Sequence, residues 1–232
     1  MRTEYFGEIK AVAFDIDGTL YKELPFNLRV APYFLIHLNF FLPFNKVRKE
    51  LRHNKPEGFY DDFNSEQVRL LSEKLKCSPE KAEKKLNKIV YEGLKKYYQK
   101  LKPYKGARDF IKRLKETGIK VAILSDFPPE QKGDIWGIKD YCDFLLGSEQ
   151  TGALKPSPHV FSVLQKTLNI PAEEILYVGN NHKYDIEGSK KAGMKAAWII
   201  TPGKKRSGTT SEIADVIFTE YSELETKFFE NK

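Results

Sequence analysis

Four apolar segments of the chain each end in polar side chains that could act together in a reaction. These side chains are Asp15 and Asp17, Ser125 and Asp126, Lys155, and Asn180 with the nearby Asp185. Paired carboxylates can supply a nucleophile and a proton donor, and carboxylate oxygens suit a hard cation. A single acid at the end of a strand is commonly a turn former or a helix cap. Four such ends in sequence indicate a shared site instead.

Short apolar runs that alternate with helical patterns must position these residues. The runs cover residues 9–15, 119–126, 142–147, 174–179, 195–200 and 214–219. Helical patterns cover residues 107–117, 158–168 and 186–192, and Gly118 and Gly193 close the first and last of them. This alternation predicts an α/β fold built on a parallel sheet. Ligands of such sheets bind at the carboxyl ends of the strands, so the polar ends should meet there.

Residues 21–102 depart from that alternation. Helical patterns cover residues 65–75 and 78–101, where Ser78 is a suitable N-cap and Pro79 occupies the first helical position. No strand pattern occurs in this stretch. We therefore predict an all-helical insert at 21–102, placed between two parts of one α/β core at 1–20 and 103–232.

The most apolar stretch, residues 30–44, raises the question of a membrane span. It has about 15 residues and contains two prolines, whereas a bilayer crossing needs about 20 apolar residues. We predict a buried or lid-forming helix between Pro32 and Pro43, with contact to a membrane surface as the alternative.

The composition is that of a globular protein, with 41% hydrophobic and 31% charged residues in a chain of 232. The two cysteines, Cys77 and Cys142, are too few for a disulfide framework, which favours a reducing compartment. The first residues lack the pattern of a secretory signal. We expect a cytoplasmic protein.

The basic excess of the chain lies in the predicted insert. Residues 21–102 contain 18 Lys and Arg against 10 Asp and Glu, so their net charge is +8, while the rest of the chain carries −1. This charge could attract an anionic substrate, or it could reflect a solvated helical surface rich in lysine. Aromatic residues of the 30–44 stretch, such as Phe34, could instead line a pocket for an apolar group or form the core of the insert.

At these positions the chain resembles the haloacid dehalogenase superfamily of phosphohydrolases, in its phosphatase-type branch with a helical cap inserted after the first motif. The motifs that carry the resemblance are "DIDGTL" (15–20), "ILSD" (123–126), "LKPSP" (154–158) and "VGNNHKYDIEGSKKAGM" (178–194). They occur in the family's order, over residues 9–20 and 103–219. The resemblance implies a Rossmann-like core with helices on both faces of the sheet, and it makes the helical insert the cap domain.

The resemblance also implies roles for individual residues. Asp15 would be the nucleophile that becomes an aspartyl-phosphate, and Asp17 the general acid and base. Lys155 would supply positive charge, with Ser125 at the phosphoryl group. The implied metal ligands for Mg²⁺ are Asp15, Asp17 through its backbone carbonyl, Asp185 and Asn180.

Two residues depart from the usual motifs. Asp126 stands where the family often has asparagine; we place it at the phosphate, with a loop cap as the alternative. Asn180 stands where the family usually has aspartate, so it offers Mg²⁺ an oxygen without charge. We expect Asp185 to make the anionic metal contact, directly or through water.

The expected function is Mg²⁺-dependent hydrolysis of a phosphate monoester of a small metabolite through an aspartyl-phosphate. Asp17 favours phosphoryl transfer over dehalogenation, because a halide leaves without needing a proton. A phosphomutase of the same superfamily and a catalytically weakened binding or regulatory protein remain as alternatives. The expected partner is a small phosphorylated substrate that could be anionic elsewhere too, with no nucleic acid and no membrane. The chain is expected to be a monomer or a homodimer.

Overall fold

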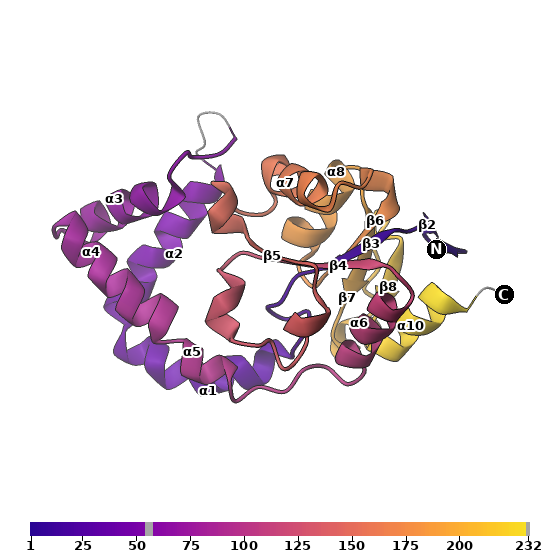
Figure 1. Ribbon diagram of the computed structural model, residues 1–232. Helices are drawn as coiled ribbons and strands as arrows, with labels where there is room; N and C mark the ends of the chain where they lie inside the picture. Colours follow the sequence, from indigo (N-terminus) through magenta and orange to yellow (C-terminus); the bar gives the residue numbers. More distant parts are fainter. Residues whose placement is uncertain (54–57, 231–232) are drawn as a thin grey trace.

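A parallel sheet forms the centre of the computed structural model, which describes residues 1–53 and 58–230 (Figure 1). Its six strands lie in the order β5-β4-β3-β6-β7-β8, and every pairing is parallel. They are β3 (Ala11–Phe14), β4 (Lys120–Ser125), β5 (Phe144–Gly147), β6 (Ile175–Gly179), β7 (Lys195–Ile199) and β8 (Val216–Phe218). The predicted α/β fold with a parallel sheet is confirmed. β3 and β6 are buried along their whole length because helices cover both faces.

Helices pack on each face of the sheet, so that alternate residues of a strand enter different cores. On one face lie α6 (Ala107–Glu116) and α10 (Tyr221–Phe229), and on the other α7 (Pro158–Leu168) and α8 (Glu187–Lys191) (Figure 1). Phe14 of β3 packs with Phe110 of α6 in one cluster. Its neighbour Ala13 packs with Phe161 of α7 in another. Packing on both faces fixes the position of β3 in the sheet, and with it the position of Asp15, which directly follows the strand.

Residues 23–98, which we call the helical segment, contain helices and no strand in the part that the structure describes. The elements are α1 (Glu23–Ile36), α2 (Leu38–His53), α3 (Phe63–Leu75), α4 (Pro79–Leu86), the π-helical η1 (Asn87–Glu92) and α5 (Lys95–Tyr98). They gather on one side of the sheet (Figure 1). One hydrophobic cluster runs from Leu86 in this segment to Val12 in the central strand.

The apolar stretch 30–44 is not one helix between Pro32 and Pro43, as the sequence suggested. The chain bends at His37, and both prolines lie inside helices, Pro32 in α1 and Pro43 in α2. A proline removes one backbone hydrogen bond of a helix but does not fix where the helix ends. The bend brings the rings of Phe34 and Phe41 to 4.4 Å between centroids in an edge-to-face contact.

The predicted helix at 78–101 is likewise divided into α4, η1 and α5. Ser78 caps α4 by accepting a hydrogen bond from the backbone N–H of Lys81, as expected. No helix of the described ranges has the length and apolar character that a membrane crossing requires.

The remaining elements are short and surround the sheet. They are a hairpin of β1 (Arg2–Thr3) and β2 (Gly7–Glu8), helix α9 (Pro202–Arg206), the π-helical η6 (His182–Ile186), and the 3₁₀ turns η2 (Pro129–Lys132), η3 (Lys139–Tyr141), η4 (Ser148–Thr151) and η5 (Ala172–Glu174). Three of them, η2, η4 and η6, follow the carboxyl ends of β4, β5 and β6 and therefore border the predicted site.

Candidate active site

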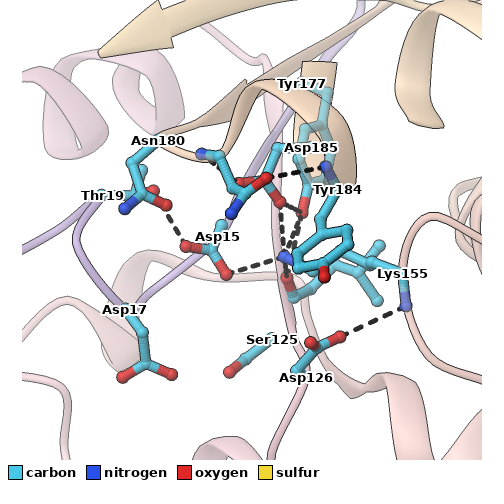
Figure 2. Close-up of polar contacts among 12 residues, drawn as sticks. Asp15, Asp17, Thr19, Ser125, Asp126, Lys155, Tyr177, Asn180, Tyr184 and Asp185 are labelled. Carbon is cyan, nitrogen blue, oxygen red and sulfur yellow. Dashed lines mark hydrogen bonds and ion pairs between the residues drawn. The ribbon is translucent and has the colours of Figure 1, made fainter. Parts of the chain in front are cut away.

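Lys155 joins two carboxylates at the carboxyl edge of the sheet (Figure 2). Its Nζ atom lies 2.8 Å from Oδ1 of Asp15 and 2.6 Å from Oδ1 of Asp185. The same ammonium group lies 3.1 Å from the hydroxyl of Tyr177. The lysine side chain is only 3% exposed, so water contributes little to its solvation. Residues from three separate motifs thus form one buried ionic cluster.

The charges of this cluster depend on one another. Burial by itself lowers the pKa of Lys155, but Asp15 and Asp185 outweigh it and hold that pKa well above its usual value. Burial raises the pKa of Asp15 to about 7; Lys155 opposes this effect, and the carboxylates of Asp185 and Asp17 add to it. Lys155 is therefore a permanent cation, and a further cation beside Asp15 would favour its ionised form.

The turn after β3 holds the carboxylate of Asp15 in place. The hydroxyl of Thr19 donates to Oδ2 of Asp15 at 2.9 Å. Gly18 has a φ of +81°, and a Cβ atom built there would lie 2.1 Å from Nδ2 of Asn180. The positive φ favours glycine at this position, and any larger residue would also have to displace the Asn180 amide. The turn brings the first and fourth motifs into direct contact.

Lys132 is a site residue that the sequence did not reveal. Its Nζ atom lies 3.1 Å from Oδ2 of Asp17 and 3.4 Å from Oγ of Ser125, and its side chain is completely buried. The hydroxyl of Tyr21 donates to the other oxygen of Asp17 at 2.6 Å. Lys132 is the last residue of η2, three positions after Pro129, where no periodic pattern distinguishes one lysine from its neighbours. Its place soon after the polar end of β4 was the only available signal.

Ser125 and Asp126 lie together at the end of β4, but they have different surroundings. Ser125 is fully buried beside Lys132. Asp126 forms an ion pair with Arg52 of α2 at 2.6 Å and accepts a 3.3 Å hydrogen bond from the backbone N–H of Lys155. Burial raises the pKa of Asp126, but the cations of Arg52, Lys155 and Arg48 lower it to about 2. Both oxygens of Asp126 thus have partners within the protein.

Asn180 faces a carboxylate from the helical segment. Its Nδ2 atom donates to Oε1 of Glu23, the first residue of α1, at 3.0 Å. The indole N–H of Trp198 donates to the backbone carbonyl of Asn180 at 2.9 Å. The next residue, Asn181, donates its backbone N–H to Oδ2 of Asp185 at 2.9 Å. Glu23 thus brings a negative charge next to the one position where the fourth motif lacks it.

These side chains border a cavity of about 520 Å³ whose charged lining is mainly acidic. The acidic lining residues are Asp15, Asp17, Glu23, Asp126 and Asp185, while Lys155 is the cation among the described lining residues. Arg52 neutralises Asp126, which still leaves the cavity negative. An anionic ligand would be repelled unless a cation entered with it.

The donor set suits Mg²⁺, a hard cation that prefers oxygen. Carboxylate oxygens of Asp15 and Asp185 and the amide of Asn180 line one cavity. Within the described ranges no cluster of three or more His, Cys, Asp or Glu side chains is arranged to hold a metal. Mg²⁺ commonly takes only one or two carboxylates from a protein and completes its shell with water and phosphate oxygens. The residues present therefore fit the ion.

Helix α2 is the part of the helical segment whose arginines contact the loops beside the site. Arg48 pairs with Glu149 in η4, and its guanidinium lies 4.5 Å from the ring centroid of Phe127. One turn later, Arg52 donates to the backbone carbonyl of Lys155 at 2.7 Å. Both arginines are largely buried. Residues of the insert thus contact the lysine motif directly.

Comparison with known proteins gives a consistent family. A family model described as haloacid dehalogenase-like hydrolase matches residues 9–193. The 5-amino-6-(5-phospho-D-ribitylamino)uracil phosphatase YigB of Escherichia coli is 27% identical over 206 residues, which are 83% of this chain and 84% of that protein. The family model's match covers the first three motifs and all of the fourth except its last residue, Met194.

Solved structures of the same fold carry two kinds of activity in their names. The crystal structure of a HAD phosphatase from Thermococcus onnurineus has a TM-score of 0.63 at 24% identity, covering 94% of this chain and 97% of that one. The 2-haloacid dehalogenase of Pseudomonas syringae pv. Tomato DC3000 has a TM-score of 0.65 at 19% identity, with 94% and 97% covered. At these identities the likeness establishes the fold, and the site itself must distinguish the reactions.

Proposed function

The chain belongs to the haloacid dehalogenase-like hydrolases, and from this premise we propose that it is a Mg²⁺-dependent phosphohydrolase acting on a phosphate monoester of a small metabolite. The observation that carries the proposal is the buried contact of Lys155 with Asp15 and Asp185, with Asp17 two residues away. In this proposal the helical segment serves as the cap domain over the α/β core.

Asp15 would act as the nucleophile. One of its carboxylate oxygens forms a bond to phosphorus, and the bond between phosphorus and the ester oxygen breaks. Asp17 gives a proton to the departing alkoxide, which leaves as the alcohol. A water molecule then attacks the aspartyl-phosphate, Asp17 takes its proton, and inorganic phosphate and free Asp15 result.

Positive charge around the phosphoryl group would come from several sources. Mg²⁺, when bound, offsets the negative charges of substrate and nucleophile as a Lewis acid. Lys155 contributes a fixed ammonium at Asp15, and Ser125 donates its hydroxyl to a phosphoryl oxygen. Lys132 fixes the carboxylate of Asp17 and adds a second buried ammonium beside Ser125. Asp126, whose oxygens are engaged by Arg52 and a backbone amide, would position the lysine motif.

Asp17 supports hydrolysis of a phosphate ester over dehalogenation. An alkoxide is a poor leaving group and needs a proton donor, whereas a halide departs as the anion. Tyr21 and Lys132 contact the two oxygens of the Asp17 carboxylate and so fix its position. A dehalogenase would have no use for an acid fixed in this way.

A catalytically weakened binding protein is the second candidate, and Asn180 is the observation that favours it. Loss of one carboxylate should weaken the hold on a divalent cation. Glu23 argues against this candidate, because its carboxylate lies 3.0 Å from the Asn180 amide and lines the same cavity. The total charge near position 180 is thereby retained.

Release of phosphate from p-nitrophenyl phosphate, measured with Mg²⁺ and again with a chelator, tests the proposal. We expect turnover only with the metal, and Asp15→Asn should lower kcat about a thousandfold or more. Asp61→Asn, at an exposed site in the insert, is the control and should leave the rate unchanged. Activity that persists in Asp15→Asn would rule out the nucleophile assignment.

A further inference from the structure

The cavity above the catalytic carboxylates has an apolar roof supplied by the helical segment. Side chains of α1, α2, η1 and α5 and of the adjoining turns form it, and the loop after β4 adds one more. The apolar lining residues are Phe26, Phe34, Leu38, Phe41, Leu42, Phe44, Val90, Leu94, Tyr98 and Phe127. Most of the charged lining residues follow β3, β4 and β6, whereas Glu23 of α1 is the charged lining residue from the described helical segment. The cavity thus has one ionic end and one hydrocarbon end.

The basic excess of the insert does not reach this cavity. No Lys or Arg of the described helical segment lines it. Five of the segment's lysines, Lys81, Lys84, Lys85, Lys88 and Lys96, instead border a separate surface hollow with Tyr33 and His37. Its two buried arginines, Arg48 and Arg52, are already paired with Glu149 and Asp126. A second anionic group on the substrate would therefore meet no free cation in the apolar end.

A polar leaving group would also lose hydration and regain few hydrogen bonds. The described part of the segment offers the cavity three neutral hydrogen-bonding groups, the side-chain amides of Asn27 and Asn45 and the hydroxyl of Tyr98. Leaving hydroxyl groups unpaired against phenylalanine and leucine is costly, whereas burial of methylene groups is favourable. The roof discriminates against sugar-like alcohols.

The mouth of the cavity is apolar as well. Leu38 and Leu42 line the cavity but remain 43% and 53% exposed, so they lie where it meets solvent. The volume of about 520 Å³ falls in the range of sites that bury a drug-sized ligand and exceeds the need of a phosphate group. An alkyl chain could pass from the carboxylates along the roof and out between these leucines.

We propose that the substrate is a phosphate monoester of an apolar alcohol, with a hydrocarbon chain that lies under Phe34 and Phe41 and leaves past Leu38 and Leu42. This inference rests on the proposed phosphohydrolase function. It reverses the expectation from net charge alone, because the position of the charges matters more than their sum.

A series of n-alkyl phosphates from ethyl to octyl, assayed below their micelle concentrations, tests the inference. We expect kcat/KM to rise about two- to fourfold for each added methylene up to hexyl, as burial of methylene groups predicts. Glycerol 3-phosphate and glucose 6-phosphate should lie at least about tenfold below hexyl phosphate. A flat series, or a preference for the polar esters, would overturn the proposal.

Two matched leucine variants locate the effect. Leu42→Asn, at the mouth, should lower kcat/KM for hexyl phosphate about tenfold more than it lowers kcat/KM for ethyl phosphate. Leu28→Asn is the control, because Leu28 is 68% exposed on α1 and does not line the cavity. Equal effects of both variants on kcat/KM would contradict the path assigned to the hydrocarbon chain of the substrate.

Binding of non-hydrolysable alkyl phosphonates, measured by calorimetry, separates this inference from the proposed function. Affinity that increases with chain length but no Asp15-dependent turnover would refute the phosphohydrolase function and retain the apolar pocket. Turnover of ethyl phosphate with no gain in binding or rate for longer chains would retain the phosphohydrolase function and refute the apolar substrate.

Discussion

The ammonium group of Lys132 lies 3.1 Å from Oδ2 of Asp17; the lysine side chain is completely buried, whereas that of Asp17 is 32% exposed. The same ammonium lies over the rings of Tyr98 and Phe127, 5.0 and 5.5 Å from their centroids. Lys132 therefore ties an acid of the first motif to aromatic residues of the cavity. It links the group that would protonate the leaving alcohol to the surface that would bind that alcohol.

Replacing Lys132 should affect poor leaving groups most. In Lys132→Met we expect kcat for an alkyl phosphate to fall about a hundredfold, while kcat for p-nitrophenyl phosphate falls about tenfold or less, because nitrophenolate needs little protonation. Steady-state kinetics with both substrates measures this difference. Lys139→Met, at an exposed site, is the control. An equal loss on both substrates would reduce Lys132 to a structural role.

Asn180 and Glu23 should share the task of attracting Mg²⁺. We expect Glu23→Gln to weaken Mg²⁺ binding about tenfold and Asn180→Asp to strengthen it by a similar factor, since a unit charge 4 Å from a cation contributes about 1 kcal/mol even in bulk water. Titration calorimetry gives the affinities without any turnover. Glu83→Gln, on the exposed side of α4, should leave them unchanged. Unaltered binding in Glu23→Gln would remove Glu23 from the site.

Asp126 should make the free energy of unfolding depend on pH in the acidic range. Its pKa is lowered from 3.8 to about 2 in the folded protein, so its stabilising effect is present above pH 4 and disappears as the pH falls toward 2. We expect Asp126→Asn to lower the free energy of unfolding by about 2 kcal/mol at pH 6, and by about half as much at pH 3. Urea unfolding at both pH values measures this. A pH-independent difference would contradict the role of the ion pair with Arg52.

Gly18 should tolerate no side chain. Gly18→Ala places a Cβ atom 2.1 Å from Nδ2 of Asn180 at a φ of +81°, so we expect loss of stability and displacement of Asn180 from Glu23. Gly7→Ala is a matched control with a φ of +75° and no atom within 4 Å of the new Cβ. The melting temperature should therefore fall much more in Gly18→Ala than in Gly7→Ala. Equal shifts would mean that backbone strain alone decides the outcome.

The sheet could be predicted from the sequence because each strand is an apolar run of the right length. The run 9–15 became β3 at 11–14, and the other five runs likewise lost one to three residues to flanking turns. The charged partners of the acids could not be predicted. Lys132 and Arg52 reach Asp17 and Asp126 from a 3₁₀ turn and from a helix of the insert. Such contacts depend on how two parts of the chain pack, which local periodicity does not record.

The character of the cavity was equally hidden in the sequence. The net charge of residues 21–102 is +8, but a net charge does not show where the charged side chains lie. In the structure, lysines such as Lys85 border an outer hollow, while Phe34 and Phe41 line the cavity that contains the carboxylates. The bend at His37, between the two prolines, separates α1 from α2 where the rings of Phe34 and Phe41 meet. It was not visible in a stretch that reads as one continuous apolar run.

The contacts of Lys155 bear on how the protein would behave when Mg²⁺ is scarce. Because its ammonium already lies between Asp15 and Asp185, those carboxylates do not face each other unshielded, and we expect the chain to fold without a metal ion. A zinc finger, in contrast, is unfolded until its ion binds. We expect this protein to stay folded when Mg²⁺ is depleted and to regain activity as soon as Mg²⁺ returns. Its output would then follow the free Mg²⁺ concentration from moment to moment, with no new synthesis.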